Sequence, residues 1–174
     1  MKKITLRHLT PEDKEKFIKA NSADWGDFAF AHYWESLAQE NFDTFIRIVP
    51  EFSRGMHIPK DHVPCTFLFV FNEENELVGR TSIRHELTEF LLKAGGHVGY
   101  GVVPEFRRRG YASAILNESL NYIRNNISEI DRVLVTCDEG NIGSQRTIEN
   151  NKGILEDIIE MPNGPRKMRF WIQL

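Results

Sequence analysis

The chain has 174 residues, of which 41% are hydrophobic and 27% are charged, and its net charge is −3. These values are ordinary for one globular domain, so we expect residues 1–174 to form a single domain. The acidic balance argues against nucleic acid as a partner, because proteins that bind nucleic acid usually carry a basic excess. The two cysteines, Cys65 and Cys137, lie in apolar runs without metal-binding spacing, which predicts buried, reduced thiols and no bound metal.

The first residues, MKKITLRHLT, contain no apolar run long enough for a signal peptide. The longest apolar stretch, residues 67–71, is far shorter than the ~20 residues that a membrane-spanning helix needs. We therefore expect a cytoplasmic protein that has no membrane partner.

The N-terminal part of the chain predicts a short strand followed by helices. Residues 4–7 form the strand, and Thr10 as a cap with Pro11 at the first helical position then starts a helix. A second helical region extends from residue 28 to about 45 and is closed by Pro50.

The middle of the chain predicts three strands. Residues 65–71 and 77–84 are rich in aromatic and β-branched residues and flank a polar turn at 72–76, which is typical of a hairpin. An irregular loop, 85–95, leads to a strand at 96–103 that has glycine at alternate positions. One face of this strand is therefore nearly bare.

The C-terminal part predicts a helix, a strand, a helix and a final hairpin. An apolar stripe from 112 to 127 indicates the first helix. A strand at 132–137 and a helix at 141–150 follow, and an Asn-Gly turn joins the last two strands, 154–161 and 167–174.

This order of elements predicts an α+β fold with a mixed, mostly antiparallel sheet. The helix that begins after residue 110 joins the strands 96–103 and 132–137, so we expect these two to form a parallel pair at the centre of the sheet.

The stretch Arg107-Arg108-Arg109-Gly110 lies between this central strand and its helix. The first N–H groups of a helix have no partner within the helix, and with the positive end of the helix dipole they form a seat for phosphate. Gly110 lets the backbone approach closely, and the arginines can add contacts of their own. A solvated basic corner is the alternative, although a positive cluster at a helix N-terminus is unfavourable without an anion.

The stretch is neither a dinucleotide fingerprint nor a P-loop, because it matches neither G-x-G-x-x-G nor G-x-x-x-x-G-K-[ST]. It resembles the pyrophosphate loop Q/R-x-x-G-x-G/A of the GNAT acetyltransferase superfamily, which residues 107–112 match between a strand and a helix. Asn141 and Ser144 fall on the superfamily's N-x-x-A-x-x-x-Y motif, with serine in the alanine position. The tyrosine position holds Ile148, which is a departure from the motif.

The resemblance implies an acyl-CoA N-acyltransferase type of fold, in which the two central parallel strands splay and acetyl-CoA lies in the gap. It implies an enzyme, an N-acetyltransferase, that moves the acetyl group directly from CoA to a primary amine. The acceptor amine would belong to a small molecule or a peptide. The residues that it implies for acetyl-CoA binding are Val102, Val103, Arg107, Arg108, Arg109, Gly110, Tyr111, Ala112, Asn141 and Ser144. Asn141 serves equally well as a helix cap, and Ser144 as a small residue that lets two elements approach.

The candidates for catalysis are His97, Tyr100 and Ser144. An amine with a pKa of about 10 is protonated at neutral pH and must lose a proton before it attacks. His97 has a pKa range suited to accept that proton, but a structural histidine explains it as well. The sequence leaves open which face of the strand meets the substrate. A thiol with a pKa of about 8.5 leaves tolerably without an acid, so the missing tyrosine at Ile148 is less damaging than a missing base.

The acceptor side is expected among the N-terminal helices. Their aromatic residues would cover one side of the acceptor channel, although most would be core; they are Trp25, Phe28, Phe30, Tyr33 and Trp34. Asp24, Asp27 or Glu35 could attract the ammonium group, and Arg84 and His85 could line the site or lie in a solvated loop. The final hairpin could pair with a second subunit in a homodimer. The alternative function is a non-catalytic acyl-CoA-binding or sensing domain.

Overall fold

The computed structural model describes residues 2–26 and 28–174, and its strands form two sheets. The first sheet has the order β1-β2-β3-β4, and the second has the order β5-β7-β6. Every described ladder is antiparallel. The strands are β1 (Thr5–Arg7), β2 (Cys65–Phe71), β3 (Leu77–Arg84), β4 (Val98–Val102), β5 (Arg132–Asp138), β6 (Ile154–Ile159) and β7 (Lys167–Gln173).

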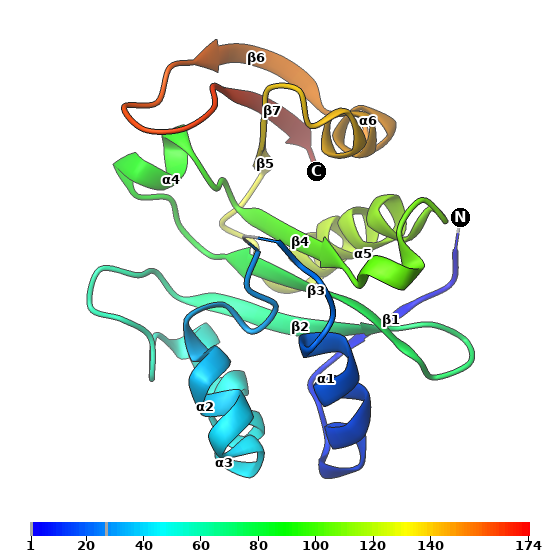
Figure 1. Ribbon diagram of the computed structural model, residues 1–174. Coiled ribbons are helices and arrows are strands. Elements are labelled where there is room, and N and C mark those ends of the chain that lie inside the picture. The colour runs from blue at the N-terminus through cyan, green and yellow to red at the C-terminus, as the bar shows by residue number, and fades with distance from the viewer. Residues whose placement is uncertain (1, 27) are drawn as a thin grey trace.

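The helices cover both faces of the first sheet (Figure 1). On one face lie α1 (Lys14–Asn21), α2 (Glu35–Glu40) and α3 (Phe42–Ile48), and on the other lies α5 (Tyr111–Asn126). The short α4 (Glu89–Lys93) precedes β4, and α6 (Ile142–Asn150) follows β5. Because β2 is covered on both sides, all seven of its residues are buried, and its sequence is a continuous apolar run rather than an alternating one.

Phenylalanine fills the space between the first sheet and the N-terminal helices. The ring of Phe17 lies 5.4 to 5.9 Å from three other rings, those of Phe42, Phe45 and Phe69. Aromatic pairs at such distances stabilise the fold beyond the burial of their area. These rings belong to the first of two hydrophobic cores. The second core lies between α5, β5 and β7.

The two sheets approach each other where β4 and β5 begin to diverge (Figure 1). The N–H of His97 donates to the carbonyl of Leu134 at 2.7 Å, and the N–H of Leu134 donates to Nδ1 of His97 at 2.9 Å. Along the described residues no ladder continues between β4 and β5. The expected α+β fold class is therefore confirmed, and the central pair is splayed to the point where each strand belongs to a separate sheet.

The predicted helix at 28–45 is broken in the structure. A 3-10 helix, His32–Trp34, precedes α2, and α3 begins afresh after Asn41. Asn41 has an extended φ of −145°, and its side chain accepts a hydrogen bond from the N–H of Thr44, so it caps α3. The last α-helix of this region ends at Ile48, just before Pro50, and the chain continues in another 3-10 helix, Val49–Arg54, with Pro50 in its first turn.

The sequence also missed α4, which lies inside the segment 85–95 that was expected to be an irregular loop. The Thr88 side chain caps this helix by accepting the N–H of Leu91. The helix has five residues, too few to show an apolar periodicity. Within the described residues, the helices all fall short of the length and apolar character needed to cross a bilayer.

Candidate functional site

The start of α5 leaves a set of backbone N–H groups without helical partners. Gly110 is the cap residue and has a φ of 85°, in the left-handed region that favours glycine. The first hydrogen bond of the helix runs from the N–H of Ala114 to the carbonyl of Gly110, so the N–H groups before Ala114 are free to bind a ligand. A Cβ placed on Gly110 would meet only Lys2 at 4.0 Å, which shows that the space beside this backbone is open.

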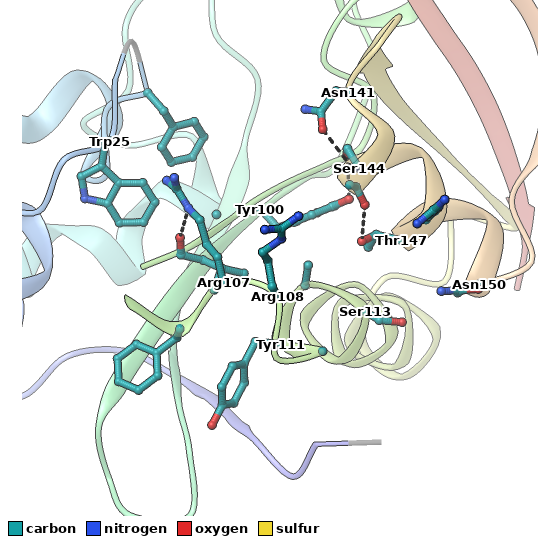
Figure 2. A pocket seen from close by; sticks show the side chains of 18 residues that line it. Trp25, Tyr100, Arg107, Arg108, Tyr111, Ser113, Asn141, Ser144, Thr147 and Asn150 are labelled. Carbon is teal, nitrogen blue, oxygen red and sulfur yellow. Dashed lines mark hydrogen bonds between the residues drawn. The ribbon is translucent and has the colours of Figure 1, made fainter. Parts of the chain in front are cut away.

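This backbone forms one end of a cavity of about 520 Å³, which we call the loop cavity (Figure 2). Strand β4, the segment after it and α6 supply its walls. Its lining residues are Trp25, Phe28, Tyr100, Gly101, Val102, Phe106, Arg107, Arg108, Gly110, Tyr111, Ala112, Ser113, Asn141, Gly143, Ser144, Arg146, Thr147 and Asn150. Most of the residues that the sequence predicted for acetyl-CoA binding are thus gathered around one cavity.

Two of the predicted residues, Val103 and Arg109, are not among the described lining residues of this cavity. The Val103 N–H donates to the carbonyl of Val78, and its own carbonyl accepts the N–H of Phe106, so both backbone groups are already engaged. The guanidinium of Arg109 lies 5.6 Å from the centre of the Phe106 ring. Strand-like pairing with a ligand would therefore involve the backbone before Val103.

The first turn of α6 contributes hydroxyl and amide groups. Asn141 caps the helix, because its Oδ1 accepts the N–H of Ser144 at 3.0 Å. This contact engages only the amide oxygen, so the Nδ2 group can still donate to a ligand. The Ser144 Oγ lies 2.9 Å from the hydroxyl of Tyr100, and Figure 2 shows the two side chains pointing toward each other from α6 and β4.

Ser144, the hydroxyl partner of Tyr100, lies one helical turn before the tyrosine position of the motif, which holds Ile148. Ile148 is fully buried in the second core, one turn after Ser144 on the same helix. Burial raises the pKa of Tyr100, and the hydrogen bond to Ser144 only partly opposes this. Tyr100 is therefore protonated at neutral pH and able to donate a proton.

The structure places His97 away from this pair. Its side chain is buried, and its Nδ1 accepts the Leu134 N–H that ties β5 to the start of β4. Burial, with a smaller contribution from the charge of Arg84, lowers the pKa of His97 to about 4. Among the described lining residues, His97 belongs neither to the loop cavity nor to the two cavities that continue from it. These contacts support a structural role for His97. They give no support to the prediction that His97 is the general base.

Two more cavities continue from the loop cavity toward the N-terminal helices and α4. The arginine cavity, about 270 Å³, shares Phe28, Tyr100, Asn141 and Ser144 with the loop cavity. Its other lining residues are His32, Arg80, Arg84, Gly95, Val98, Gly99, Thr136, Cys137, Asp138 and Lys167. Because the two cavities share four residues, they meet at the Tyr100–Ser144 pair.

The outer cavity is larger, at about 710 Å³, and shares His32, Arg84, Gly95 and Lys167 with the arginine cavity. Its remaining lining is largely apolar and comprises Tyr33, Trp34, Ile58, Asp61, His62, Val63, Cys65, Phe67, Ser82, Thr88, Phe90, Leu91, Ala94, Met161 and Asn163. The three cavities therefore form a series that runs from the start of α5 to the N-terminal helices and α4.

Sequence reasoning missed Arg80 and His32 as cavity residues. Arg80, Ser82 and Arg84 alternate along β3, so their side chains share one face of the sheet. Two arginines four positions apart, and so on one face of a largely apolar strand, were the available signal. His32 gave none: it begins the 3-10 helix with a left-handed φ of 59°, and its side chain lines both the arginine cavity and the outer cavity.

The other predicted acceptor residues are scattered. Trp25 and Phe28 line the loop cavity and Phe30 is core, whereas Tyr33 and Trp34 line the outer cavity. Asp24 is exposed and bonds to the N–H of Gly26, and Glu35 is absent from the described cavity linings. Asp27 lies outside the described residues. His85 hydrogen-bonds to Thr66, at 2.9 Å, and does not join the described lining residues.

The thiols are unsuited to nucleophilic attack. Burial raises the pKa of both Cys65 and Cys137 to about 11, so both are protonated at neutral pH. Across residues 2–26 and 28–174, no three His, Cys, Asp or Glu side chains gather in a way that could hold a metal ion.

Comparisons with known proteins agree on one family. A family model described as "Acetyltransferase (GNAT) domain" matches residues 3–153. An acetyltransferase (GNAT family) from Bacillus anthracis is 19% identical with a TM-score of 0.64, and the match covers 99% of this chain and 96% of that one. Spermidine/spermine N-acetyltransferase SpeG from Vibrio cholerae is 18% identical with a TM-score of 0.61, over 98% and 92% of the two chains. At these identities the structural likeness establishes the fold. No curated protein matches the chain.

Proposed function

Since the chain belongs to the GNAT family of acetyltransferases, we propose that it transfers an acetyl group from acetyl-CoA to a primary amine. The observation that carries the proposal is the meeting of the loop cavity and the arginine cavity at Tyr100 and Ser144. Acetyl-CoA would enter from one side of this point and the amine from the other. The acetyl carbon and the attacking nitrogen would then meet beside two hydroxyl groups.

The residues of the loop cavity fit the coenzyme. The free N–H groups before Ala114 and the open space beside Gly110 suit a diphosphate. Arg107 is held by a hydrogen bond from Nε to the carbonyl of Val102, which leaves its terminal nitrogens for a ligand. The Nδ2 group of Asn141 is available for an amide oxygen of the pantetheine arm. Acetyl-CoA is the co-substrate in this family, and direct attack of an amine on its thioester needs no metal.

Tyr100 and Ser144 can supply and accept the protons that move during the transfer. The free amine attacks the thioester carbonyl, the C–N bond forms, the C–S bond breaks and its electron pair goes to sulfur. Tyr100 donates its hydroxyl proton to that sulfur. The proton that the new amide nitrogen must lose passes through the Ser144 hydroxyl or water back to the tyrosine oxygen. The products are the N-acetylated amine and CoA with a free thiol.

The test is release of free thiol from acetyl-CoA in the presence of a panel of amines, amino acids, polyamines and peptides. We expect thiol release that depends on the acceptor and gives a product heavier by one acetyl group in mass spectrometry. Calorimetry with CoA measures binding separately. CoA binding with no transfer to any acceptor would contradict the proposal and favour the non-catalytic sensing domain.

A further inference from the structure

Two guanidinium groups converge on the bare face of β4. A Cβ placed on Gly99 would lie 3.6 Å from Nη1 and Nη2 of Arg84 and 3.9 Å from Nη1 of Arg80. Gly99 thus lies beneath both charged groups, and together with them it lines the arginine cavity. The glycine leaves room above the strand that a side chain would fill.

Arg80 is almost completely buried, with 2% of its surface exposed, yet its charge has little compensation. Its Nε has no hydrogen-bond partner, and a terminal nitrogen reaches the carbonyl of Ala29 only at 3.4 Å. The aromatic faces of Phe28 and Phe67 lie 4.4 and 5.4 Å from the guanidinium carbon. Rings of this kind attract a cation weakly compared with a carboxylate.

Arg84 adds a second positive charge without a carboxylate. Its Nη1 donates to the carbonyls of Gly95 and Gly96, at 3.0 and 3.1 Å, which fixes its position above β4. The ion pairs formed among the described residues include neither Arg80 nor Arg84. Burial and the charge of Arg84 lower the pKa of Arg80 to about 9, so Arg80 keeps its charge at neutral pH. A buried charge beside a partly buried charge of the same sign destabilises a protein unless an anion joins them.

Resting on the proposed function, we propose that the acceptor is a primary amine that carries a carboxylate, which Arg80 and Arg84 bind above Gly99. Among the described lining residues of this cavity, Asp138 is the one carboxylate, and it already pairs with Lys167. A substrate carboxylate would satisfy the unpartnered Nε of Arg80 and separate the two like charges. The amine, a few bonds away, would lie toward Tyr100 and Ser144.

The lining of the outer cavity indicates the chemical character of the rest of the acceptor. Its lining includes Trp34, Phe67, Phe90 and Leu91, which favour an apolar or aromatic group. An amino acid with an apolar side chain combines the three features, since it has a carboxylate, an amine next to it and an apolar group. Polyamines, which carry only positive charges, would be repelled by the two arginines.

The same arginines help to prepare the amine for attack. Nearby positive charges disfavour an ammonium group, so they lower its pKa and favour loss of the proton. The carboxylate keeps the acceptor bound while this happens. The cavity therefore has less need of a strong base, in agreement with the position of His97 outside it.

The first experiment compares matched acceptors that differ at the carboxylate. Leucine and phenylalanine are each compared with their amides and with the corresponding decarboxylated amines, and spermidine is included. For the free acids we expect kcat/KM at least about 30-fold above that of the amides, the lower end of the range found when one partner of a buried charge pair is removed. Aminoalkylphosphonates separate a preference for carboxylate from one for phosphate-like groups. Equal rates with acids and amides, or faster reaction of spermidine or the phosphonates, would overturn the assignment.

The second experiment uses Arg80→Met with Arg7→Met as its matched control. Arg7 lies in the same sheet but is paired with Asp13. For Arg80→Met we expect the preference for acid over amide to fall to near one, whereas Arg7→Met leaves it unchanged. A uniform loss of rate with all acceptors would instead mean that Arg80 stabilises the transition-state oxyanion, which contradicts the proposal.

A binding measurement separates this inference from the proposed catalytic function. Calorimetry of N-acetylleucine and of its amide, with CoA present, reports recognition of the carboxylate without turnover. We expect binding of the acid that is lost in Arg80→Met. The melting temperature of free Arg80→Met should equal or exceed that of the wild type, because a buried uncompensated charge is removed. No binding of the acid, or a melting temperature lowered by several degrees, would count against a carboxylate site even if acetyl transfer is found.

Discussion

The groups that face the loop cavity and the arginine cavity differ in origin. In the loop cavity the groups that we propose to bind an anion are backbone N–H groups, oriented by Gly110 and by the first turn of α5. In the arginine cavity they are side chains of β3 that reach over a glycine of β4. A site made of backbone depends on one short stretch of sequence, whereas a site made of side chains depends on which strands become neighbours.

The largest expected effect tests the backbone nature of the loop cavity. Replacing Gly110 by valine forces a β-branched residue into a φ of 85° and fills the open space beside the N–H groups. Loss of one or two hydrogen bonds to a charged group, at about 1.5–3 kcal/mol each, lowers CoA affinity by about 100-fold. Calorimetry with CoA measures this fall in affinity.

Gly164→Val is the matched control for Gly110→Val. Gly164 also has a left-handed φ, 109°, with open space around it, but it lies in the connection between β6 and β7. Both variants carry the same kind of backbone strain, about 1–3 kcal/mol. If Gly164→Val lost as much CoA affinity as Gly110→Val, strain rather than contact would explain the result.

The junction of the two cavities is the next target. Tyr100→Phe removes the hydroxyl that contacts Ser144 and leaves the ring in place. We expect kcat to fall by about tenfold, below the usual range of acid–base effects, because a thiolate is a tolerable leaving group. CoA affinity should stay the same. Ser144→Ala is expected to act in the same direction, and the double variant to lose little more than Tyr100→Phe alone, because the two hydroxyls form one unit.

His97 provides a contrast, because we expect its replacement to affect stability and not catalysis. His97→Ala leaves the Leu134 N–H without its acceptor, at a cost of about 1–3 kcal/mol in unfolding free energy at neutral pH. Activity per folded molecule should remain close to that of the wild type. A large fall in kcat, together with a changed pH profile of activity, would contradict this prediction and support His97 as the general base.

The difference in unfolding free energy between wild type and His97→Ala should depend on pH, and its direction follows from the lowered pKa of His97. The pKa of His97 is lowered from 6.5 to about 4 in the folded protein, so the unfolded state binds more protons between these values. The stability that neutral His97 contributes is present above pH 6.5 and is lost as the pH falls toward 4. The gap in unfolding free energy between wild type and His97→Ala should therefore narrow over that range, as measured by urea denaturation.

The sequence could predict the loop cavity because a local pattern specifies it. Residues 107–112 contain both the glycine and the helix start that orient the N–H groups, and Asn141 and Ser144 lie within one turn of another helix. The order of the elements likewise predicted the α+β fold. Short elements were the exception, since α4 and the break at Asn41 depend on single capping side chains.

The arginine cavity could not be predicted in the same way. It requires β3 to lie beside β4 so that Arg80 pairs with Gly101 across the sheet, and it requires His32 to approach from a segment about fifty residues earlier. No local sequence pattern predicts that these segments lie close together. The sequence placed acidic residues and Arg84 on the acceptor side, but it gave no reason to expect the buried Arg80 beside the partly buried Arg84.

The smallest expected effect tests whether side chains contribute to the loop cavity. Arg108 has a left-handed φ of 61°, so Arg108→Gly relieves strain and should change stability by less than about 1 kcal/mol. If backbone groups hold the diphosphate, CoA affinity should fall by less than about tenfold, the equivalent of 1.4 kcal/mol. Arg109→Gly, which removes the same charge outside the cavity lining, is the control. A loss in Arg108→Gly as large as that in Gly110→Val would mean that the loop cavity, like the arginine cavity, holds its anion with side chains.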